Sequence, residues 1–243
     1  PFSMEFASAS MLDTIDEIRT TLGGLKGASD QADSDFYEEI LAVLQKMIKQ
    51  RNDSIEAFDT AGYVYLGLDH FALPEDELSV AAADGTLHRN FMGYTTQRGR
   101  EMISLGVSSI GEVDGCYVQN IANEPEYVKD VAERGFATYR GHAMTPEDRL
   151  RRDIILELMC NGRVDKRRIE AEHGIDFDAT FALELGELRI PVEDGLVELS
   201  AEQIKLTPVG QVLMRNVAVP FDRYLRERKA RGETGKSTFS KTL

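Results

Sequence analysis

Apolar residues recur at helical spacing in two stretches near the start of the chain. In residues 11–26 they fall three or four positions apart, and glycines at 23, 24 and 27 close the stretch. The same pattern covers residues 36–58 and ends at Gly62, a residue suited to a left-handed helix cap. Residues 28–34 are small and acidic, which is typical of a loop or linker. The sequence therefore predicts two amphipathic helices separated by a loop.

A short strand with aromatic and β-branched side chains is predicted at Tyr63–Leu68, directly after the second helix. It breaks into the polar pair Asp69-His70. A helix over about Glu75–Ala83 and a short strand over Met102–Val107 follow. This order of helices and strands predicts an α/β arrangement, and loops that follow strands are common places for functional side chains.

The pattern changes at Thr145, where Thr-Pro-Glu-Asp supplies an N-cap, a proline at the first helical position and acidic residues in the first turn. The predicted elements from here are a helix to about Cys160, helices Asp165–Glu172 and Asp178–Leu188, strands Leu196–Leu199 and Ile204–Leu206, and a final helix from Thr207. Helices followed by a hairpin and a helix suggest a winged-helix-like module. We expect an unassigned helical segment at 1–35, an α/β segment at 36–144 and a helical, winged-helix-like domain at 145–243.

Charge and cysteine content narrow the possible partners. The formal net charge of −14 over 243 residues disfavours non-specific binding to nucleic acid or to anionic lipid. The helix that would read DNA in a winged-helix domain carries Asp178, Glu184 and Glu187, so we expect no nucleic-acid partner. No apolar stretch has membrane-spanning length, so we also expect no membrane partner. Two cysteines argue against a disulfide scaffold and favour a reducing cytoplasm.

Several polar side chains are candidates for chemistry. Asp69-His70 could face a substrate, although on spacing alone a turn that caps its own backbone is the better interpretation. Guanidinium groups match carboxylates well, but a single arginine more often forms a surface ion pair. The arginines considered are Arg89, Arg98, Arg140, Arg151 and Arg152. The histidines at 88, 142 and 173 share no metal-ligand spacing with each other or with the cysteines, so we predict no metal site.

Four segments together resemble one family. They are residues 67–96, which include Gly-Leu-Asp-His-Phe and Phe-Met-Gly-Tyr-Thr-Thr, and residues 106–110, 117–120 and 151–160. Over roughly residues 36–243 the chain resembles oxygen-independent coproporphyrinogen III oxidase, a radical S-adenosylmethionine enzyme of haem synthesis. The resemblance implies oxidative decarboxylation of two propionates of coproporphyrinogen III to vinyl groups, started by a 5′-deoxyadenosyl radical. It also implies the last strands and helices of a radical-SAM-type barrel before the C-terminal domain, which we expect to be all-α.

The resemblance also implies site residues. Phe91 and Met92 fall where the family contacts a second S-adenosylmethionine, and Ile110 falls where the family packs on the first. The family has Gln where this chain has Met92, and a thioether hardly hydrogen-bonds, so the resemblance does not extend to the polar half of the second contact. For Phe91, Met92 and Ile110 alike, the alternative is simple core packing. The porphyrinogen would be bound by Asp69, His70, Arg89, Arg151 and Arg152.

The chain lacks the family's Cys-x3-Cys-x2-Cys segment, which holds a [4Fe-4S] cluster. Its only cysteines are Cys116 and Cys160, and a cluster needs several thiolates converging on one point. We therefore expect the C-terminal half of such an enzyme, inactive alone, with the cluster-binding half missing or on a separate chain. The alternative is a non-catalytic module that binds a tetrapyrrole or a partner protein. A winged-helix regulator is a third, weaker interpretation.

Overall fold

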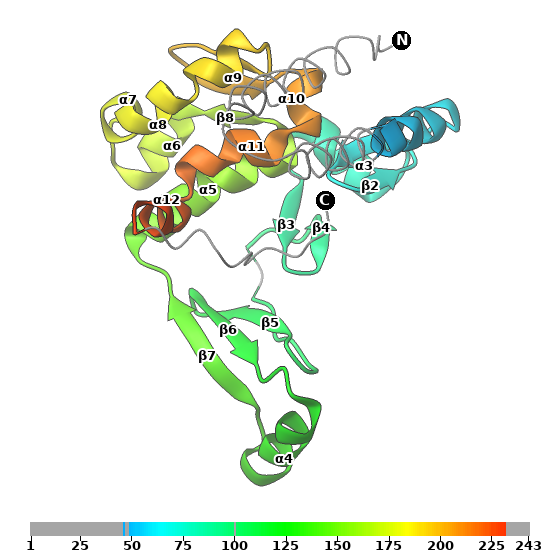
Figure 1. Ribbon diagram of the computed structural model, residues 1–243, viewed down its shortest axis with the longest axis vertical. Coiled ribbons are helices and arrows are strands. Elements are labelled where there is room, and N and C mark those ends of the chain that lie inside the picture. Colours follow the sequence, from blue (N-terminus) through cyan, green and yellow to red (C-terminus); the bar gives the residue numbers. More distant parts are fainter. Residues whose placement is uncertain (1–45, 47–48, 100, 232–243) are drawn as a thin grey trace, which may run out of the picture.

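The computed structural model describes residue 46 and residues 49–99 and 101–231 (Figure 1). The helix predicted at 11–26 lies outside these residues. Of the second predicted helix, residues 49–60 are described and are helical, and Gly62 follows with a φ of +86° as expected for a left-handed cap. Within the described part of the chain, no helix is long and apolar enough to cross a membrane.

Two small antiparallel hairpins and a helix follow. Strands β1 (Val64–Gly67) and β2 (His70–Ala72) pair, α3 spans Glu77–Asp84, and β3 (His88–Asn90) pairs with β4 (Gly93–Thr95). The predicted strand and helix are therefore present. Because β1 turns straight back into β2, Asp69 lies in a hairpin turn and His70 is the first residue of β2, so the pair is not at the exit of a parallel strand.

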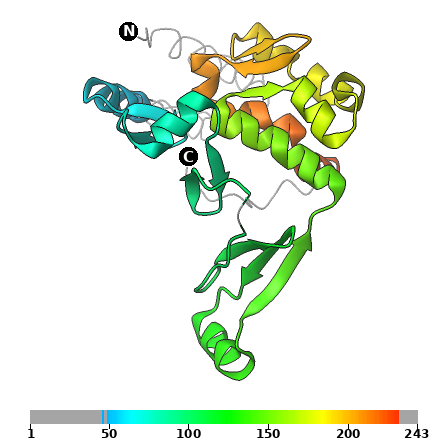
Figure 2. The same ribbon diagram turned by 180° about the vertical axis from the view of Figure 1, so that it is seen from behind.

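The middle of the chain forms a three-stranded antiparallel sheet that extends away from the helices (Figures 1 and 2). Its strands, in the order β5-β6-β7, are Ile110–Val113, Cys116–Asn120 and Thr138–Ala143, and α4 (Glu124–Arg134) lies at its far end. Asp114 and Gly115 both have positive φ, which is the usual geometry of a two-residue hairpin turn. The strand predicted at Met102–Val107 is wrong: only Met102 bridges to Glu112, and Ile103 and Leu105 are more than 80% exposed, at 81% and 86%.

The remainder folds around α5 (Pro146–Asn161), which follows β7 after two residues. A second antiparallel sheet, in the order β8-β10-β9, contains Arg163–Asp165, Gln203–Leu206 and Val197–Leu199. The helices are α6 (Lys166–His173), α7 (Phe177–Thr180), α8 (Ala182–Glu187), α9 (Arg189–Glu193), α10 (Pro208–Val212), α11 (Met214–Ala218), the 3-10 helix η1 (Val219–Phe221) and α12 (Arg223–Ala230). The predicted start and end of α5 and the predicted hairpin, now β9–β10, are confirmed. The region is not all-α, because it contains the β8-β10-β9 sheet.

Two predicted helices are broken into shorter ones. The helix expected at Asp178–Leu188 is interrupted at Phe181, whose ring is fully buried between Phe177 and Phe221. The final helix is interrupted at Leu213 and again at the 3-10 turn that contains Pro220. All sheets among the described residues have two or three antiparallel strands, so this part of the chain contains no closed barrel.

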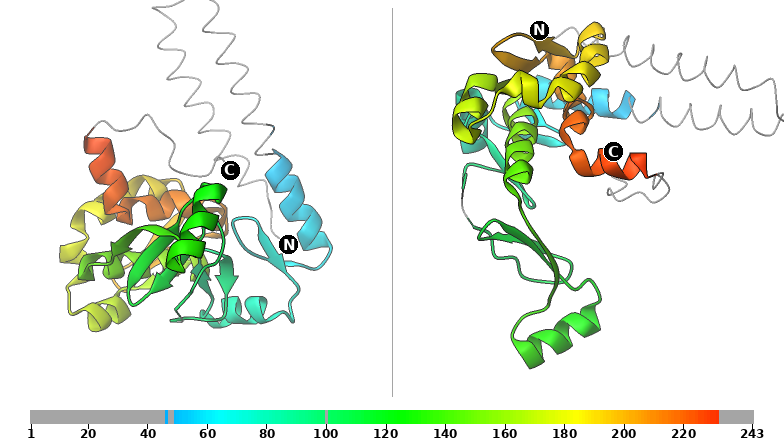
Figure 3. Two further views of the ribbon diagram at one scale, coloured as in Figure 1. Left: turned by 90° about the horizontal axis from the view of Figure 1, so that it is seen from below. Right: turned by 90° about the vertical axis from the view of Figure 1, so that its left-hand side faces the viewer.

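Helix α5 is the centre of the core. Ile154 and Leu158 are fully buried, and one apolar cluster joins them to the β8-β10-β9 sheet, α6, α7 and α11. On its other side, Leu156 and Cys160 of α5 pack with Ala81 of α3 and Leu87. Through these contacts α5 connects the small hairpins with the C-terminal elements, and the β5-β6-β7 sheet with α4 extends away from both (Figure 3, right).

We expect residues 145–243 to fold as a separable domain, because nearly all fully buried large side chains of the described chain belong to the cluster around α5. A fragment of residues 145–243 should unfold cooperatively in urea when followed by circular dichroism. A fragment of residues 63–144, which has few buried apolar side chains of its own, serves as the comparison and should show no such transition. Non-cooperative unfolding of the first fragment would place the boundary elsewhere.

The start of α5 makes stability depend on pH. Thr145 and Asp148 form a reciprocal capping box, and Tyr224 donates to Asp148 at 2.9 Å. Although burial favours the neutral acid, hydrogen bonds from Thr145 and Tyr224 lower the pKa of Asp148 to about 2. The carboxylate therefore stabilises the fold by about 1–2 kcal/mol above pH ~4, and this is lost as the pH falls toward 2.

Asp148→Asn should lower the free energy of unfolding by that amount at pH 7, and the difference from wild type should vanish near pH 2, measured by urea titration at each pH. The exposed Asp84→Asn is the control and should change stability by less than about 0.5 kcal/mol. An equal effect of Asp148→Asn at both pH values would show that the carboxylate charge is not responsible.

Candidate functional site

Side chains from three parts of the fold meet where the β3–β4 hairpin, the β5-β6-β7 sheet and α5 come together. The ring of Phe91, in the β3–β4 turn, stands edge-on to Tyr117 of β6, with 5.1 Å between ring centroids. The guanidinium of Arg152 lies 5.6 Å from the centre of the same Tyr117 ring. Arg152 also binds both carboxylate oxygens of Glu112 on β5, at 2.7 and 2.8 Å. We call Phe91, Glu112, Tyr117 and Arg152 the Tyr117 cluster.

The environment of this cluster favours neutral aromatic and imidazole groups. Burial raises the pKa of Tyr117, and the charges of Arg152 and Glu112 oppose each other there. Burial also lowers the pKa of neighbouring His88, and the positive charges of Arg152 and Arg98 add to that effect. His88 is therefore neutral at pH 7, and it lines a small cavity together with Arg98, Asp153 and Glu157, among others.

The predicted cofactor residues lie on one side of this junction. Ile110 pairs with Gln119, and Glu112 pairs with Tyr117, so these four residues share one face of the β5–β6 ladder. Phe91 packs on that face through Tyr117. Phe91 and Met92 are exposed by 50% and 83%, and Ile110 is half-buried. The fold therefore places Phe91 and Ile110 over the same sheet face rather than in separate cores, and leaves Met92 accessible.

The predicted substrate residues lie in three places: Arg152 belongs to the Tyr117 cluster, Arg151 lies in the C-terminal core, and the other three lie near Tyr94. His70 is edge-on to the ring of Tyr94, and its Nδ1 lies 3.0 Å from Asp69, whose side chain is 87% exposed. Arg89 lies over the same ring, with 5.3 Å between its guanidinium and the centre of the Tyr94 ring. Tyr94 donates to the carbonyl of Met159 at 2.8 Å, and burial raises its pKa. The β1–β2 and β3–β4 hairpins therefore meet at Tyr94, and this contact brings together Asp69, His70 and Arg89.

Arg89 is the arginine of this group with unused hydrogen-bonding capacity. Its Nη1 is buried without a hydrogen-bond partner among the described residues. A buried guanidinium donor without a partner is costly, so a carboxylate that reached this nitrogen would be bound favourably.

The guanidinium of Arg151 is engaged in contacts within the C-terminal part of the fold. Its guanidinium donates to Glu147, Glu184 and the carbonyl of Phe221, and its side chain is only 14% exposed. Glu184 is shared with Arg226. These contacts satisfy Arg151 inside the C-terminal core, so the geometry favours packing over substrate binding. Of the other arginines, Arg98 lies 3.6 Å from Glu157 and Arg140 binds Gln119 from β7.

The cysteines do not fit an iron–sulfur cluster. Cys160 is buried in α5, and burial together with the charge of Glu157 raises the pKa of its thiol to about 12. Cluster ligands are thiolates, so a buried protonated thiol is unsuited to the task. Cys116 is half-buried at the start of β6. Phe91 presents an accessible aromatic ring beside the sheet face that carries Ile110.

Sequence reasoning missed Tyr117 and Glu112 as members of the site. Tyr117 lies in a segment that resembles the family, but no spacing rule connects it with Phe91 or Arg152. The contact depends on the β5–β6 register and on how the β3–β4 turn meets the sheet. A strand prediction for residues 110–120 would have found the pair Glu112–Tyr117, and the Asp-Gly turn between the strands was the available signal.

The chain is similar to one group of known proteins. A model described as the HemN C-terminal domain matches residues 144–213. Over 184 residues the chain is 41% identical to an oxygen-independent coproporphyrinogen III oxidase of Salmonella typhimurium, which covers 76% of this chain and 40% of that protein. A relative of the same name from Thermostichus vulcanus is 41% identical over 204 residues, covering 84% of this chain and 59% of the relative.

A solved structure shows the same similarity. Coproporphyrinogen III oxidase (HemN) from Escherichia coli, described as a radical SAM enzyme, superposes with a TM-score of 0.69 at 42% identity. The superposition covers 71% of this chain and 40% of that one. The chain thus spans about 40% of the length of the Salmonella and Escherichia proteins.

Proposed function

Because the chain is similar to the C-terminal part of oxygen-independent coproporphyrinogen III oxidases, we propose that it forms that part of an enzyme converting coproporphyrinogen III to protoporphyrinogen IX. The observation that carries the proposal is the Tyr117 cluster, in which Phe91, a residue that the resemblance assigns to cofactor binding, contacts the same ring as Arg152. Identity of 41% over 184 residues supports the oxidase over the alternative of a non-catalytic tetrapyrrole- or partner-binding module.

In this proposal the chain supplies one wall of an S-adenosylmethionine site. Phe91 and Met92, at the β3–β4 turn, would contact the second S-adenosylmethionine, and Ile110, on the adjoining sheet face, would contact the first. Arg152 would position Phe91 indirectly. Its guanidinium is bound by Glu112 and packs on the ring of Tyr117, against which Phe91 rests. When bound, S-adenosylmethionine supplies the radical chemistry of the family.

The porphyrinogen would be recognised through its carboxylates. Arg89 is the strongest candidate, since its buried Nη1 has no partner among the described residues. Asp69 and His70 belong to the neighbouring β1–β2 hairpin, where His70 packs on Tyr94, the strand partner of Arg89. Arg151 would stabilise the C-terminal core rather than bind the porphyrinogen, because its guanidinium already donates to Glu147 and Glu184.

The [4Fe-4S] cluster has no site in this proposal. Neither the spacing of the two cysteines nor the buried state of Cys160 suits it. The cluster-binding part would come from polypeptide outside these residues, on the same chain or on a separate one. The two free thiols suit the reducing cytoplasm, where we propose that the enzyme acts.

The test uses a joined enzyme, in which the matching part of this chain replaces the corresponding part of the Escherichia coli oxidase. Met92→Gln in the joined enzyme should strengthen binding of one S-adenosylmethionine by about tenfold, because an amide adds a donor and an acceptor where the thioether has neither. Binding is measured by equilibrium dialysis. Leu105→Gln is the control, because Leu105 is equally exposed, at 86%, in a neighbouring loop. Unchanged affinity on Met92→Gln would remove Met92 from the site.

A further inference from the structure

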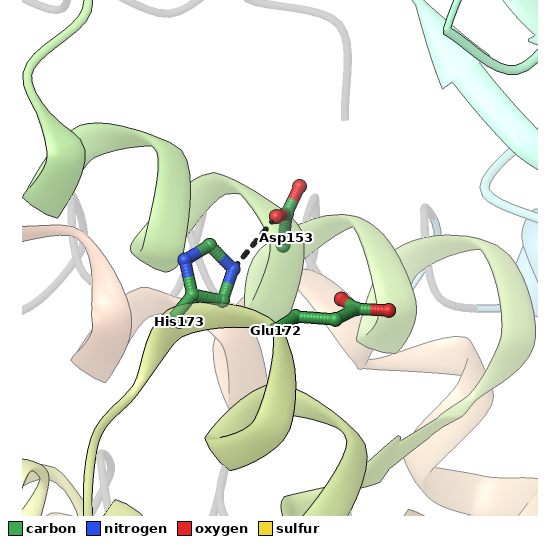
Figure 4. Close-up of side chains that lie close together, drawn as sticks. All are labelled: Asp153, Glu172 and His173. Atoms are coloured by element: carbon green, nitrogen blue, oxygen red, sulfur yellow. Dashed lines mark hydrogen bonds and ion pairs between the residues drawn. The ribbon is translucent and has the colours of Figure 1, made fainter.

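A cluster of possible metal ligands lies between α5 and α6, apart from the Tyr117 cluster. Asp153 projects from α5, and Glu172 and His173 come from the end of α6 (Figure 4). One ligand atom from each of the three lies within 4.8 Å of the other two. It is the one such group of three among the residues that the structure describes. The spacing of histidines in the sequence gave no sign of it, because Asp153 is brought in by the packing of the two helices.

The fold fixes two of these side chains. His173 Nε2 lies 3.0 Å from Asp153 Oδ2, and the imidazole faces the carboxylate (Figure 4). The side chain of His173 is 18% exposed and that of Asp153 is 33% exposed. Gly174 follows in a left-handed conformation and ends α6, which sets where His173 points. The pair is therefore preformed and is open to solvent on one side.

The third side chain is free to complete the site. Glu172 is 45% exposed, and its contact with Arg168 is long, at 4.0 Å. Arg168 instead binds Glu157 closely, at 2.7 Å. A tetrahedral ion with ligands at about 2.1 Å needs ligand atoms about 3.4 Å apart. A rotation of the accessible Glu172 side chain would bring its carboxylate to that distance without moving either helix.

We propose that Asp153, Glu172 and His173 bind a divalent transition metal ion of the Zn²⁺ class, with water completing the coordination. One imidazole and two carboxylates are ligands typical of Zn²⁺ and its first-row neighbours, whereas Mg²⁺ and Ca²⁺ prefer oxygen alone. With a neutral imidazole the three groups carry two negative charges, which a divalent cation neutralises. The ion would link α5, the centre of the core, to α6.

The test is metal binding by the whole, tag-free chain after treatment with chelator. Zn²⁺ should compete for one equivalent against a colorimetric chelator, and Co²⁺ should give visible d–d absorption. His173→Ala and Glu172→Gln should each weaken Zn²⁺ binding at least tenfold and reduce the Co²⁺ spectrum. His142→Ala is the matched control: His142 lies 3.3 Å from Asp148 but belongs to no group of three possible ligands among the described residues, so binding should be unchanged.

Folding of each variant is checked by circular dichroism. Should His173→Ala fail to fold, Glu172→Gln decides, because this exposed side chain contributes little to packing. Zn²⁺ should also raise the melting temperature of the wild type and leave that of Glu172→Gln unchanged. The proposal is overturned if the wild type binds Zn²⁺ no more tightly than Glu172→Gln does, or if His142→Ala weakens binding as much as the cluster variants do.

Discussion

Replacing Gly210 by Ala should destabilise the fold by about 3 kcal/mol or more. Gly210 lies in the first turn of α10, and a Cβ there would come within 1.9 Å of the carbonyl oxygen of Leu196 and within 2.9 Å of its carbon. That carbonyl is held in place, because it accepts a hydrogen bond from the backbone of Thr207 at 3.0 Å. Backbone cannot yield as a flexible side chain could, so the contact between α10 and the start of β9 must open.

Gly186→Ala is the matched control for this prediction. Gly186 is also helical, in α8, but a Cβ there meets nothing within 4 Å. Alanine should therefore raise stability by about 0.5–1 kcal/mol through its higher helix propensity. Both variants are compared with wild type by urea unfolding followed by circular dichroism. Equal midpoints for Gly210→Ala and wild type would mean that the approach of α10 to Leu196 is not as close as described.

Replacing Phe91 by Ala should weaken binding of one S-adenosylmethionine to the joined enzyme by about tenfold. The ring is half exposed and is held edge-on against Tyr117, so it offers its free face to a ligand. Covering half of an aromatic side chain with a nucleoside contributes about 1.5 kcal/mol, which corresponds to a factor of about ten in affinity. Equilibrium dialysis with labelled S-adenosylmethionine measures the effect.

Phe136→Ala provides the comparison for Phe91→Ala. Phe136 is similarly exposed, at 55%, and lies under Arg134 at the end of α4 rather than at the Tyr117 cluster. Its removal should leave affinity unchanged, so a general effect of losing an exposed aromatic ring is separated from loss of the binding wall. If both variants bind S-adenosylmethionine like the wild type, Phe91 has no part in the site.

The elements that the sequence predicted well are those whose signals are local. The start of α5 depends on Thr145, Pro146 and Asp148, which act within one turn, and its end at Asn161 depends on the adjacent Gly162. The hairpin Val197–Leu206 was likewise predicted, because its strands are close in sequence. Such signals need no knowledge of the rest of the fold.

Elements decided by long-range packing were predicted poorly. The helix expected through Phe181 breaks because burying that ring beside Phe221 outweighs continuing the helix. The segment at Met102–Val107 has the composition of a strand, but the strand that pairs with β6 is β5, so these residues pass along its edge through a single bridge.

The same limit applies to the site. Sequence reasoning selected Phe91, Ile110 and Arg152 separately, on resemblance and on charge. It could not select Tyr117, because the ring becomes the common contact of Phe91 and Arg152 only after three elements have packed together. Nor could it group Asp153 with His173, since that proximity is created by the packing of α6 on α5.

The central claim is that this chain carries the S-adenosylmethionine wall of a coproporphyrinogen oxidase but not its cluster. It is tested most directly by measuring 5′-deoxyadenosine after anaerobic treatment with iron, sulfide and reductant, with S-adenosylmethionine and coproporphyrinogen III present. The chain alone should give no more than a protein-free blank, whereas the joined enzyme with its cluster loaded should give 5′-deoxyadenosine. Product from the chain alone, or none from a folded joined enzyme that carries an intact cluster, would contradict the claim.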